Sequence, residues 1–324
     1  MAHDSDDDRL GAVIAVTNQK GGVGKTTTTV SLAAALAQSG IRTLVVDLDP
    51  QGNATTGLGL RPAAGAPSTY RVIVEGKDVE SSAEPTSVKH LDVLPSSLDL
   101  AGAEIELVPA FSREQRLKDA LGKVRDQYDV ILIDCPPSLG LLTINALVAA
   151  DQVIVPIQCE YYALEGLGQL LRSVSMVGNS LNQGLHVGGV VMTMFDGRTN
   201  LSQQVVDEVR EHFGDQVFNT VIPRTVRLSE APSYGQPITV FDPSSKGALA
   251  YTRLAREVAQ RLGLAFEDEE VSALDRLLGA APSMPSAPVP RRDDGDLPGL
   301  DHLRDIAPDV LPSSTATDSG AHHE

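Results

Sequence analysis

Lys20-Gly-Gly-Val-Gly-Lys-Thr26 is the stretch of sequence that decides the fold. It follows a short apolar, β-branched run at 12–17 and precedes a helical pattern at 26–38 that stops before Gly40. A glycine-rich turn between a strand and a helix lets backbone N–H groups approach phosphate oxygens, and the helix N-terminus adds partial positive charge. The stretch therefore predicts a phosphate-binding loop, with contacts expected from Gly21, Gly22, Val23, Gly24, Lys25, Thr26 and Thr27.

Two side chains in this loop have the chemistry that a nucleoside triphosphate requires. In a phosphate loop, the lysine before the hydroxyl residue reaches the β- and γ-phosphates, and we expect this role for Lys25. The hydroxyl that follows binds Mg²⁺, and we expect this role for Thr26. The cofactors predicted from the loop are therefore ATP and Mg²⁺.

Outward from the loop, strand-like and helix-like segments alternate as far as Leu262. This alternation predicts βαβ units, and hence an α/β fold with a mostly parallel twisted sheet, helices on both faces and the topology of a P-loop NTPase. A capping-box spacing at Ser112 and Gln115 predicts one further helix that runs to Val124. The expected strands are 43–48, 91–94, 130–133, 153–157 and 187–193, and the other expected helices are 161–177, 200–213 and 246–262.

Acidity is concentrated at the two ends of the chain. The net charge is −17, of which residues 1–8 contribute −4 and residues 265–324 contribute −9, which leaves −4 for residues 9–264. The second stretch holds seven prolines between 282 and 312 and too few apolar residues to offset its ordering entropy. We therefore expect an acidic disordered segment at 1–9, one ATPase domain at 10–263, and a mostly disordered tail at 264–324 with a possible short helix at 271–278.

Two acidic elements follow predicted strands. Asp47 and Asp49 end the strand at 43–48, and on an extended chain residues two apart share one face. Carboxylates at strand C-termini line the ligand crevice of an open α/β sheet, so one can lie near Mg²⁺ while the other orients water. Asp134 ends the apolar strand at 130–133, which is a Walker B pattern whose carboxylate holds a Mg²⁺-bound water.

The loop departs from the ordinary phosphate-loop pattern in one position, because Gln19 stands where a glycine is expected and Lys20 follows it. This resembles the deviant Walker A motif of the ParA/MinD group of ATPases. The resemblance implies that Lys20 reaches across a dimer and neutralises phosphate charge on the partner's nucleotide, as an arginine finger does. It also implies that Asp49 activates the attacking water and that Asp47 supports the metal.

Longer stretches resemble the ParA/Soj chromosome-partitioning ATPases in particular, across about 10–263. They are Leu100-Ala-Gly-Ala-Glu-Ile-Glu-Leu107, Gln158-Cys-Glu-Tyr-Tyr-Ala-Leu-Glu-Gly166 and Val221-Ile-Pro-Arg-Thr-Val-Arg-Leu-Ser-Glu-Ala-Pro232. The resemblance implies an ATP-dependent homodimer that binds double-stranded DNA non-specifically and is released by hydrolysis that a ParB-type partner stimulates. Pro223 and Thr225 are expected near the adenine, and this chain has Thr225 where the family commonly has Asn.

The same resemblance assigns DNA contacts to basic side chains on three loops. Arg198 and Arg227 match the binding arginines of the family, and Arg224 and Lys246 are weaker candidates. Loop arginines suit phosphate contacts, which carry charge but no sequence information. The expected location is the cytoplasm, because the N-terminus lacks the apolar run of a signal peptide and no apolar run reaches membrane-spanning length. Association with the nucleoid is what the resemblance implies.

Three other classes of protein with this fold are weaker interpretations. A MinD-like membrane ATPase needs a basic amphipathic C-terminal helix, whereas this tail is acidic and rich in proline. A reductase of the nitrogenase-iron-protein type needs two cysteines per subunit, and Cys135 and Cys159 fit that number, although isolated cysteines are usually buried thiols. An ATP-dependent amide-forming or carboxylating enzyme needs a second substrate motif, and none is apparent.

Overall fold

The phosphate loop follows the central strand of a twisted parallel sheet. The computed structural model describes residues 10–160 and 165–267, and within them the strand order is β3-β4-β2-β5-β1-β6-β7-β8. Every neighbouring pair is parallel except β3 and β4. The strands are β1 (Ala12–Val16), β2 (Thr43–Asp47), β3 (Glu84–Pro85), β4 (Leu91–Leu94), β5 (Val130–Asp134), β6 (Gln152–Gln158), β7 (His186–Phe195) and β8 (Val217–Pro223). The sequence-based prediction of a mostly parallel sheet is confirmed.

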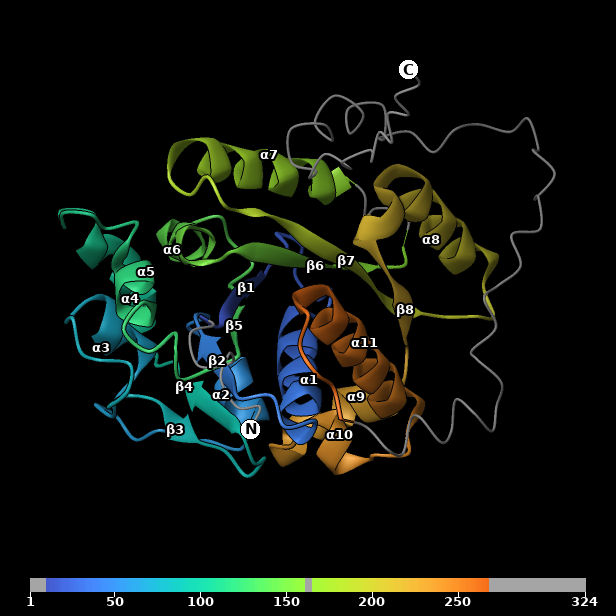
Figure 1. Cartoon of the computed structure of the whole chain (residues 1–324), viewed down its shortest axis with the longest axis horizontal. Coiled ribbons are helices and arrows are strands. Elements are labelled where there is room, and N and C mark those ends of the chain that lie inside the picture. The colour runs from blue at the N-terminus through green and yellow to red at the C-terminus, as the bar shows by residue number, and fades with distance from the viewer. Residues whose placement is uncertain (1–9, 161–164, 268–324) are drawn as a thin grey trace, which may run out of the picture.

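Helices cover both faces of this sheet, as Figure 1 shows for α1 and α11 on one side and for α6 and α7 on the other. The first face carries α1 (Lys25–Gln38), α2 (Asn53–Gly57), α9 (Val226–Glu230), α10 (Ile238–Phe241) and α11 (Lys246–Leu262). The second carries α3 (Thr69–Ile73), α4 (Leu100–Leu107), α5 (Arg116–Leu121), α6 (Leu141–Ala149), α7 (Glu165–Ser180) and α8 (Asn200–Phe213).

Strand β1 shows why the central strands carry continuous apolar runs. Val13 and Ala15 pack into the core under α6 and α7, whereas Ile14 and Val16 pack into the core under α1 and α11. Successive side chains of a strand point to opposite faces, so a strand that is covered on both sides must be apolar at every position. The same burial fixes the end of β1, and therefore fixes where the phosphate loop begins.

The helix expected at 112–124 is wrong in both boundaries. Helix α5 covers only Arg116–Leu121, and Gln115 precedes it without a side-chain cap hydrogen bond. Ser112 has a φ of 49°, which is left-handed, whereas an N-cap residue normally has β-region dihedrals. The capping-box spacing was therefore misleading, since the backbone around Ser112 makes a turn instead. The prediction also omitted β3, β8 and α6. Helix α6 was missed because it is apolar on nearly all sides and lacks helical periodicity.

Strand β8 ends the sheet among the described residues, and α11 holds it in place. The Glu257 carboxylate accepts hydrogen bonds from the backbone N–H groups of Asn219 (2.7 Å) and Thr220 (2.8 Å), and from the Thr220 hydroxyl. The Arg261 guanidinium lies 4.0 Å from the centroid of the Phe218 ring and donates to the Gly188 carbonyl at 2.8 Å. These contacts fix β8 against β7 from the α11 side.

The described chain ends shortly after α11. The Leu264 N–H donates to the Ala259 carbonyl at 2.8 Å, and Leu264 and Phe266 pack against the α1–α11 core. Residues 1–9, 161–164 and 268–324, with the predicted terminal disorder and the possible helix at 271–278, lie outside the described residues. In the part of the chain that is described, no helix has the length and apolar character needed to cross a membrane.

Candidate functional site

The glycine loop between β1 and α1 is shaped to accept a ligand through its backbone. Gly22 and Gly24 have φ values of 76° and 89°, a left-handed conformation that favours glycine. Gly24 is also the N-cap of α1 and offers no side chain to cap it. A Cβ placed on Gly21 or Gly22 would meet no atom within 4 Å, so the space beside the loop is open. Unfilled space beside backbone N–H groups at a helix start suits a phosphate.

Lys25 lies beneath this loop. Its side chain is buried, and its Nζ donates to the carbonyl of Lys20 at 3.3 Å. Burial lowers the pKa of Lys25, while the nearby carboxylates of Asp134 and Asp49 act in the opposite direction. The ammonium is thus held inside its own loop, close to the position where the sequence predicts phosphate.

Lys20 is positioned differently from Lys25, and a buried asparagine sets its backbone. The Lys20 N–H donates to Asn18 Oδ1 at 3.0 Å, and Asn18 Nδ2 donates to the Pro156 carbonyl at 2.8 Å. The Lys20 side chain is 34% exposed, and its Nζ lies 4.0 Å from Glu160 Oε2. The site therefore has one lysine directed inward and one at its surface. Sequence reasoning missed Asn18, because its partner on β6 is 138 residues away.

A second distant residue supports the loop from β7. Thr193 is buried, and its hydroxyl donates to the Val23 carbonyl (2.8 Å) and to the Ile157 carbonyl (3.1 Å). It thereby links the phosphate loop to β6. The only signal in the sequence was one polar residue within the apolar run of β7. That signal alone does not reveal which loop the hydroxyl supports.

Asp134 is fully buried beside the start of α1. It accepts hydrogen bonds from the hydroxyls of Thr26 (2.7 Å) and Thr29 (3.0 Å). In the sheet register it lies directly beside Asp47 on β2. Burial first, and then the charge of Asp47, raise the pKa of Asp134 well above the usual carboxyl range. Two buried carboxylates next to a threonine hydroxyl form a donor set that fits a divalent cation, since buried charges need a counter-charge.

Asp47 organises the loop that follows β2. Its Oδ2 accepts from the backbone N–H (2.7 Å) and the hydroxyl (2.6 Å) of Thr55, and its Oδ1 accepts from the Asp49 N–H at 3.2 Å. Asp49 in turn accepts from the Gln51 N–H at 2.9 Å. Ser96, which follows β4, donates its hydroxyl to the Asp49 carbonyl at 2.6 Å and its N–H to the Thr55 hydroxyl at 2.9 Å. We refer to Asp47, Asp49, Thr55 and Ser96 as the β2 latch.

A cavity of 430 Å³ opens beside the phosphate loop on the α1 face. Its lining includes Thr26 and Thr27 at the start of α1, and it continues between α2 and the segment from α9 to α10. Its volume is in the range of small-ligand sites, which is about 300–1,000 Å³. Pro223 and Thr225 are not among its lining residues, and the Thr225 hydroxyl instead caps α9 by accepting from the Leu228 N–H at 3.3 Å. Leu228 does line the cavity.

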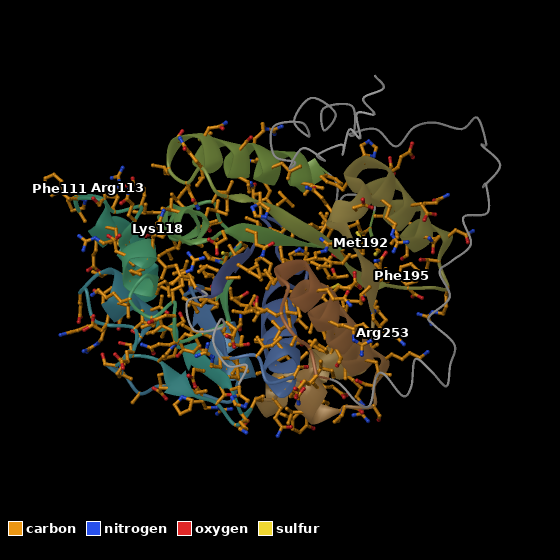
Figure 2. The ribbon with its side chains drawn as sticks, viewed as in Figure 1. Phe111, Arg113, Lys118, Met192, Phe195 and Arg253 are labelled. Atoms are coloured by element: carbon orange, nitrogen blue, oxygen red, sulfur yellow. The ribbon has the colours of Figure 1, made fainter. Side chains whose placement is uncertain are left out.

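The basic candidates gather at the carboxyl ends of β7 and β8. The Arg224 N–H donates to the Phe195 carbonyl at 2.9 Å, which joins the loop after β8 to the loop that carries Arg198. Phe195 is labelled at this end of the sheet in Figure 2. Lys246, the first residue of α11, is exposed four residues after Asp242, the ion-pair partner of Arg227. The structure thus brings the four predicted cations to one edge of the molecule.

Two of these cations are paired with acids of the same chain. The Arg198 side chain is 88% exposed, and its Nε and Nη2 donate to the two carboxylate oxygens of Asp196 at 2.9 and 2.7 Å. This pairing holds the pKa of Asp196 well below its usual range. Arg227 bridges Glu230 (3.1 Å) and Asp242 (3.2 Å). The edge is therefore less positive than the arginines alone would suggest.

Both cysteines are core residues. Cys135 and Cys159 are buried in the core on the α6–α7 face, and burial raises the pKa of both thiols, that of Cys159 to about 12. A metal cluster shared between subunits needs accessible thiolates, because the thiolate is the ligand. The structure therefore favours structural thiols over the reductase interpretation.

A glycine loop at the start of α1, a buried lysine, and a threonine hydroxyl beside a strand-end aspartate define a P-loop nucleotide hydrolase. A family model described as an AAA domain matches residues 11–187. The chain is 59% identical over 250 residues to the sporulation initiation inhibitor protein Soj of Bacillus subtilis (strain 168), covering 77% of this chain and 99% of that protein. It is 51% identical over 252 residues to the chromosome partitioning protein ParA of Myxococcus xanthus (strain DK1622), covering 78% and 89%.

The chain belongs to the ParA/Soj family of chromosome-partitioning ATPases, and it is an ATP-hydrolysing enzyme. A solved structure of cobyrinic acid a,c-diamide synthase from Mycobacterium smegmatis, with bound ADP and magnesium, is also similar. It is 40% identical with a TM-score of 0.69, and the match covers 80% of this chain and 100% of that one. Nucleotide and Mg²⁺ binding is thus a property of this group of structures.

Proposed function

We propose that ATP brings two copies of this chain together face to face, and that the pair binds double-stranded DNA without regard to sequence. Hydrolysis, stimulated by a ParB-type protein, then releases the DNA. The observation that carries the proposal is the difference between the two loop lysines. Lys25 is buried under the loop, whereas the Lys20 side chain is partly exposed and its Nζ lies 4.0 Å from Glu160 Oε2, with its backbone fixed by Asn18. A surface cation beside a nucleotide site is suited to act on the nucleotide of a partner.

The residues in the site fit a magnesium nucleotide. Thr26 and Asp134 would hold Mg²⁺, with Asp47 adjacent, and the cation would neutralise phosphate charge when bound. The chain itself contributes the backbone of Gly21, Gly22, Val23 and Gly24 for the phosphates, and the Lys25 ammonium for their charge. The cavity that begins at Thr27 would take the sugar and base, and the turn with Pro223 and Thr225 supports α9 at its wall.

Asp49 would orient the attacking water. Its side chain is nearly buried, and its backbone is tied to Ser96 through the β2 latch. A carboxylate held by a loop that packs on a second loop keeps its orientation, which general-base chemistry requires. The latch would therefore set the position of the base, and a change in either loop would alter the rate of hydrolysis.

The arginine edge would supply the DNA contacts. Arg198, Arg224, Arg227 and Lys246 lie at one end of β7, β8 and α11, so a pair of copies presents each of them twice. Counterion release increases with the number of neutralised phosphates, so pairing alone raises DNA affinity steeply. Such a protein would work in the cytoplasm on the nucleoid.

A gel shift on non-specific duplex DNA, with ATP and with ADP, tests the proposed switch. We expect binding only with ATP, and we expect light scattering to show a dimer under the same condition. Asp49→Ala should trap the ATP-bound, DNA-bound dimer, because the water-orienting group is lost while the phosphate contacts remain. Equal DNA binding with the two nucleotides would contradict the switch.

A second candidate function is ATP-dependent amide formation. It is favoured by the name of the solved relative from Mycobacterium smegmatis, a diamide synthase. The 59% identity to Soj over 99% of that protein's length favours partitioning instead. Measuring ATPase with DNA alone, with the ParB-type protein alone and with both separates the two, because only the partitioning function requires both for stimulation.

A further inference from the structure

A groove of 500 Å³ lies on the α6–α7 face, away from the cavity beside α1. One wall is α4 and the segment after it, with Glu104 and Val108, and the opposite wall is the start of α6, with Leu141 and Ile144. Leu139 before α6 and Leu181 after α7 complete an apolar lining. Helix α4 belongs to the stretch 100–107 that marks the family in the sequence, and no step of ATP binding described above uses it.

The groove contains one half-buried acid, Glu104, with an unpaired carboxylate oxygen. Glu104 Oε1 is inaccessible to solvent and has no hydrogen-bond partner among the described residues. The lining also contains Arg113, but this arginine is hydrogen-bonded to other groups: it donates to Glu114 Oε1 at 2.8 Å and to the Val108 carbonyl at 2.7 Å. A buried carboxylate oxygen without a partner is costly, and a cation that enters the groove would remove that cost.

Large apolar side chains are exposed in the segment from Ile105 to Phe111, of which Val108 lines the groove. The exposed fractions are 78% for Ile105, 58% for Val108 and 94% for Phe111, values that are high for large apolar side chains. In Figure 2, Phe111 lies at the outer edge of the molecule near Arg113. Several exposed large apolar side chains within one short segment are typical of a protein-binding surface. This segment therefore favours a polypeptide over a small ion.

The groove also touches the loop that follows the Walker B strand. A Cβ on Gly140 would overlap the Glu104 carboxylate, so the acid rests directly against this glycine. Gly140 is the N-cap of α6 and lies six residues after Asp134. A ligand that draws Glu104 toward itself would remove this contact, and so would act on the loop that follows Asp134.

We propose that this groove, lined by α4 and α6, receives an apolar segment of the ParB-type partner, and that a lysine or arginine of that segment pairs with Glu104. The inference rests on the proposed function, since it names where that partner acts. Charge complementarity indicates the chemistry of the partner. The groove offers the Glu104 carboxylate, with one unpaired oxygen, between apolar walls, so it favours a cation carried on an apolar chain. The acidic residues of this chain's own tail would be repelled from it.

The test compares ATPase stimulation in full-length variants, as the ratio of the rates with and without the ParB-type protein at saturating DNA. Glu104→Gln keeps the size of the side chain and removes its charge. Val108→Ser removes apolar area without touching Glu104. Glu106→Gln is the matched control, because Glu106 lies on the same helix but accepts from the Tyr70 hydroxyl at 2.9 Å and is not part of the groove lining.

We expect the stimulation ratio of Glu104→Gln to fall at least 10-fold, that of Val108→Ser to fall several-fold, and that of Glu106→Gln to match the wild type. Full stimulation of Glu104→Gln would overturn the inference while leaving the proposed function intact. A wild type that the partner does not stimulate would contradict the proposed function itself. If Glu104→Gln loses the ATP-dependent dimer in light scattering, the groove is a contact between copies of this chain, and the inference is wrong.

Discussion

Single hydroxyl groups carry much of the site's geometry at the scale of the residue. Thr193 and Thr239 are both buried threonines. The Thr193 hydroxyl donates to the carbonyls of Val23 and Ile157, whereas the Thr239 hydroxyl has no hydrogen-bond partner within residues 10–160 and 165–267. The same substitution at the two positions therefore separates the value of the hydrogen bond from the value of the side chain's shape.

Thr193→Val should destabilise the protein by about 1–3 kcal/mol, because it leaves the Val23 carbonyl unsatisfied in a buried place. Thr239→Val should be neutral or stabilising, since it removes a buried hydroxyl that has no partner. Urea unfolding gives both free energies. Equal losses in the two variants would show that the hydrogen bond from β7 contributes nothing to the phosphate loop.

Asp134→Asn should lower ATPase activity by about 10–100-fold, as expected when a metal-site ligand is changed. The nucleotide-free variant should nevertheless be at least as stable as the wild type at alkaline pH. The folded pKa of Asp134 is raised by burial, so its contribution to stability is full below the unfolded carboxyl pKa and is lost as pH rises through the folded value.

The measurement for this variant is thermal unfolding without nucleotide at about pH 5 and about pH 8. The difference in midpoint between variant and wild type should shift in the variant's favour at the higher pH. A difference that is independent of pH would mean that the Asp134 carboxyl is not under strain in the folded protein. The matching measurement with Mg²⁺ and ADP should favour the wild type.

How much of this site the sequence could predict depends on how local each contact is. The glycine loop and the strand-end position of Asp134 follow from strand, turn and helix signals within a few residues, so their placement could be read directly. Asn18 and Thr193 could not be identified, because their partners lie 138 and 170 residues away. A single buried polar side chain signals that a partner exists but not which one it is.

At the scale of the element, the β2 latch joins two loops into one unit. The Thr55 hydroxyl donates to Asp47 and accepts from the Ser96 N–H, so one atom connects α2 to the segment between β4 and α4. The neighbouring Thr56 makes only a local contact, in which its exposed hydroxyl donates to the Gly52 carbonyl at 3.0 Å. Thr55 therefore joins two separate loops, whereas the hydroxyl of the adjacent Thr56 bonds only within α2 and the residue before it.

Thr55→Val should loosen the segment from Asp49 to Gly57, and should lower kcat more than it changes ATP affinity. Its hydroxyl holds the loop of the proposed base, while the phosphate loop itself is untouched. Hydrogen exchange of the amides in this segment and ATPase kinetics check the two effects. Thr56→Val is the control for hydrogen exchange alone, because Thr56 lines the cavity beside the phosphate loop, and Thr55→Ser is the rescue for both. Unchanged hydrogen exchange in Thr55→Val would show that the Thr55 hydroxyl does not hold this segment in place.

Elements were predicted well where periodicity was strong and poorly where it was not. The central strands and the long helices α1, α8 and α11 lie within a few residues of their predicted bounds, because continuous apolar runs and amphipathic spacing were clear. Helix α5 was overextended, and β8 was omitted because Asn219 and Thr220 interrupt its apolar run. Both errors fall where tertiary contacts, such as those of Glu257, decide the structure.

At the scale of the whole molecule, the proposed function requires a strongly acidic chain to present a cationic edge to DNA. On binding DNA, Arg198 and Arg227 would each exchange the carboxylate with which it forms an ion pair for a phosphate. Such exposed ion pairs are weak, about 0–1 kcal/mol each, so the exchange is easily driven by a polyanion.

Arg198→Ala and Arg227→Ala should each weaken ATP-dependent DNA binding and reduce the slope of log K against log salt by about 1–2, because a dimer loses two phosphate contacts. Arg42→Ala is the control, since Arg42 precedes β2 at the opposite end of the sheet and pairs with Asp129. Binding isotherms over a salt series check the slopes. An equal loss in the Arg42 variant would mean that total charge, and not the edge, determines binding.

The contact between the Glu257 carboxylate of α11 and strand β8 has a consequence for assembly. An outermost strand with free amides invites another strand to join, and proteins that gather at high local density on a shared template are most at risk of such irreversible stacking. Glu257 occupies the amides of two successive β8 residues, Asn219 and Thr220, so these amides are not available to an added strand. This contact therefore disfavours extension of the sheet at β8, and leaves the proposed ATP-driven pairing to other surfaces.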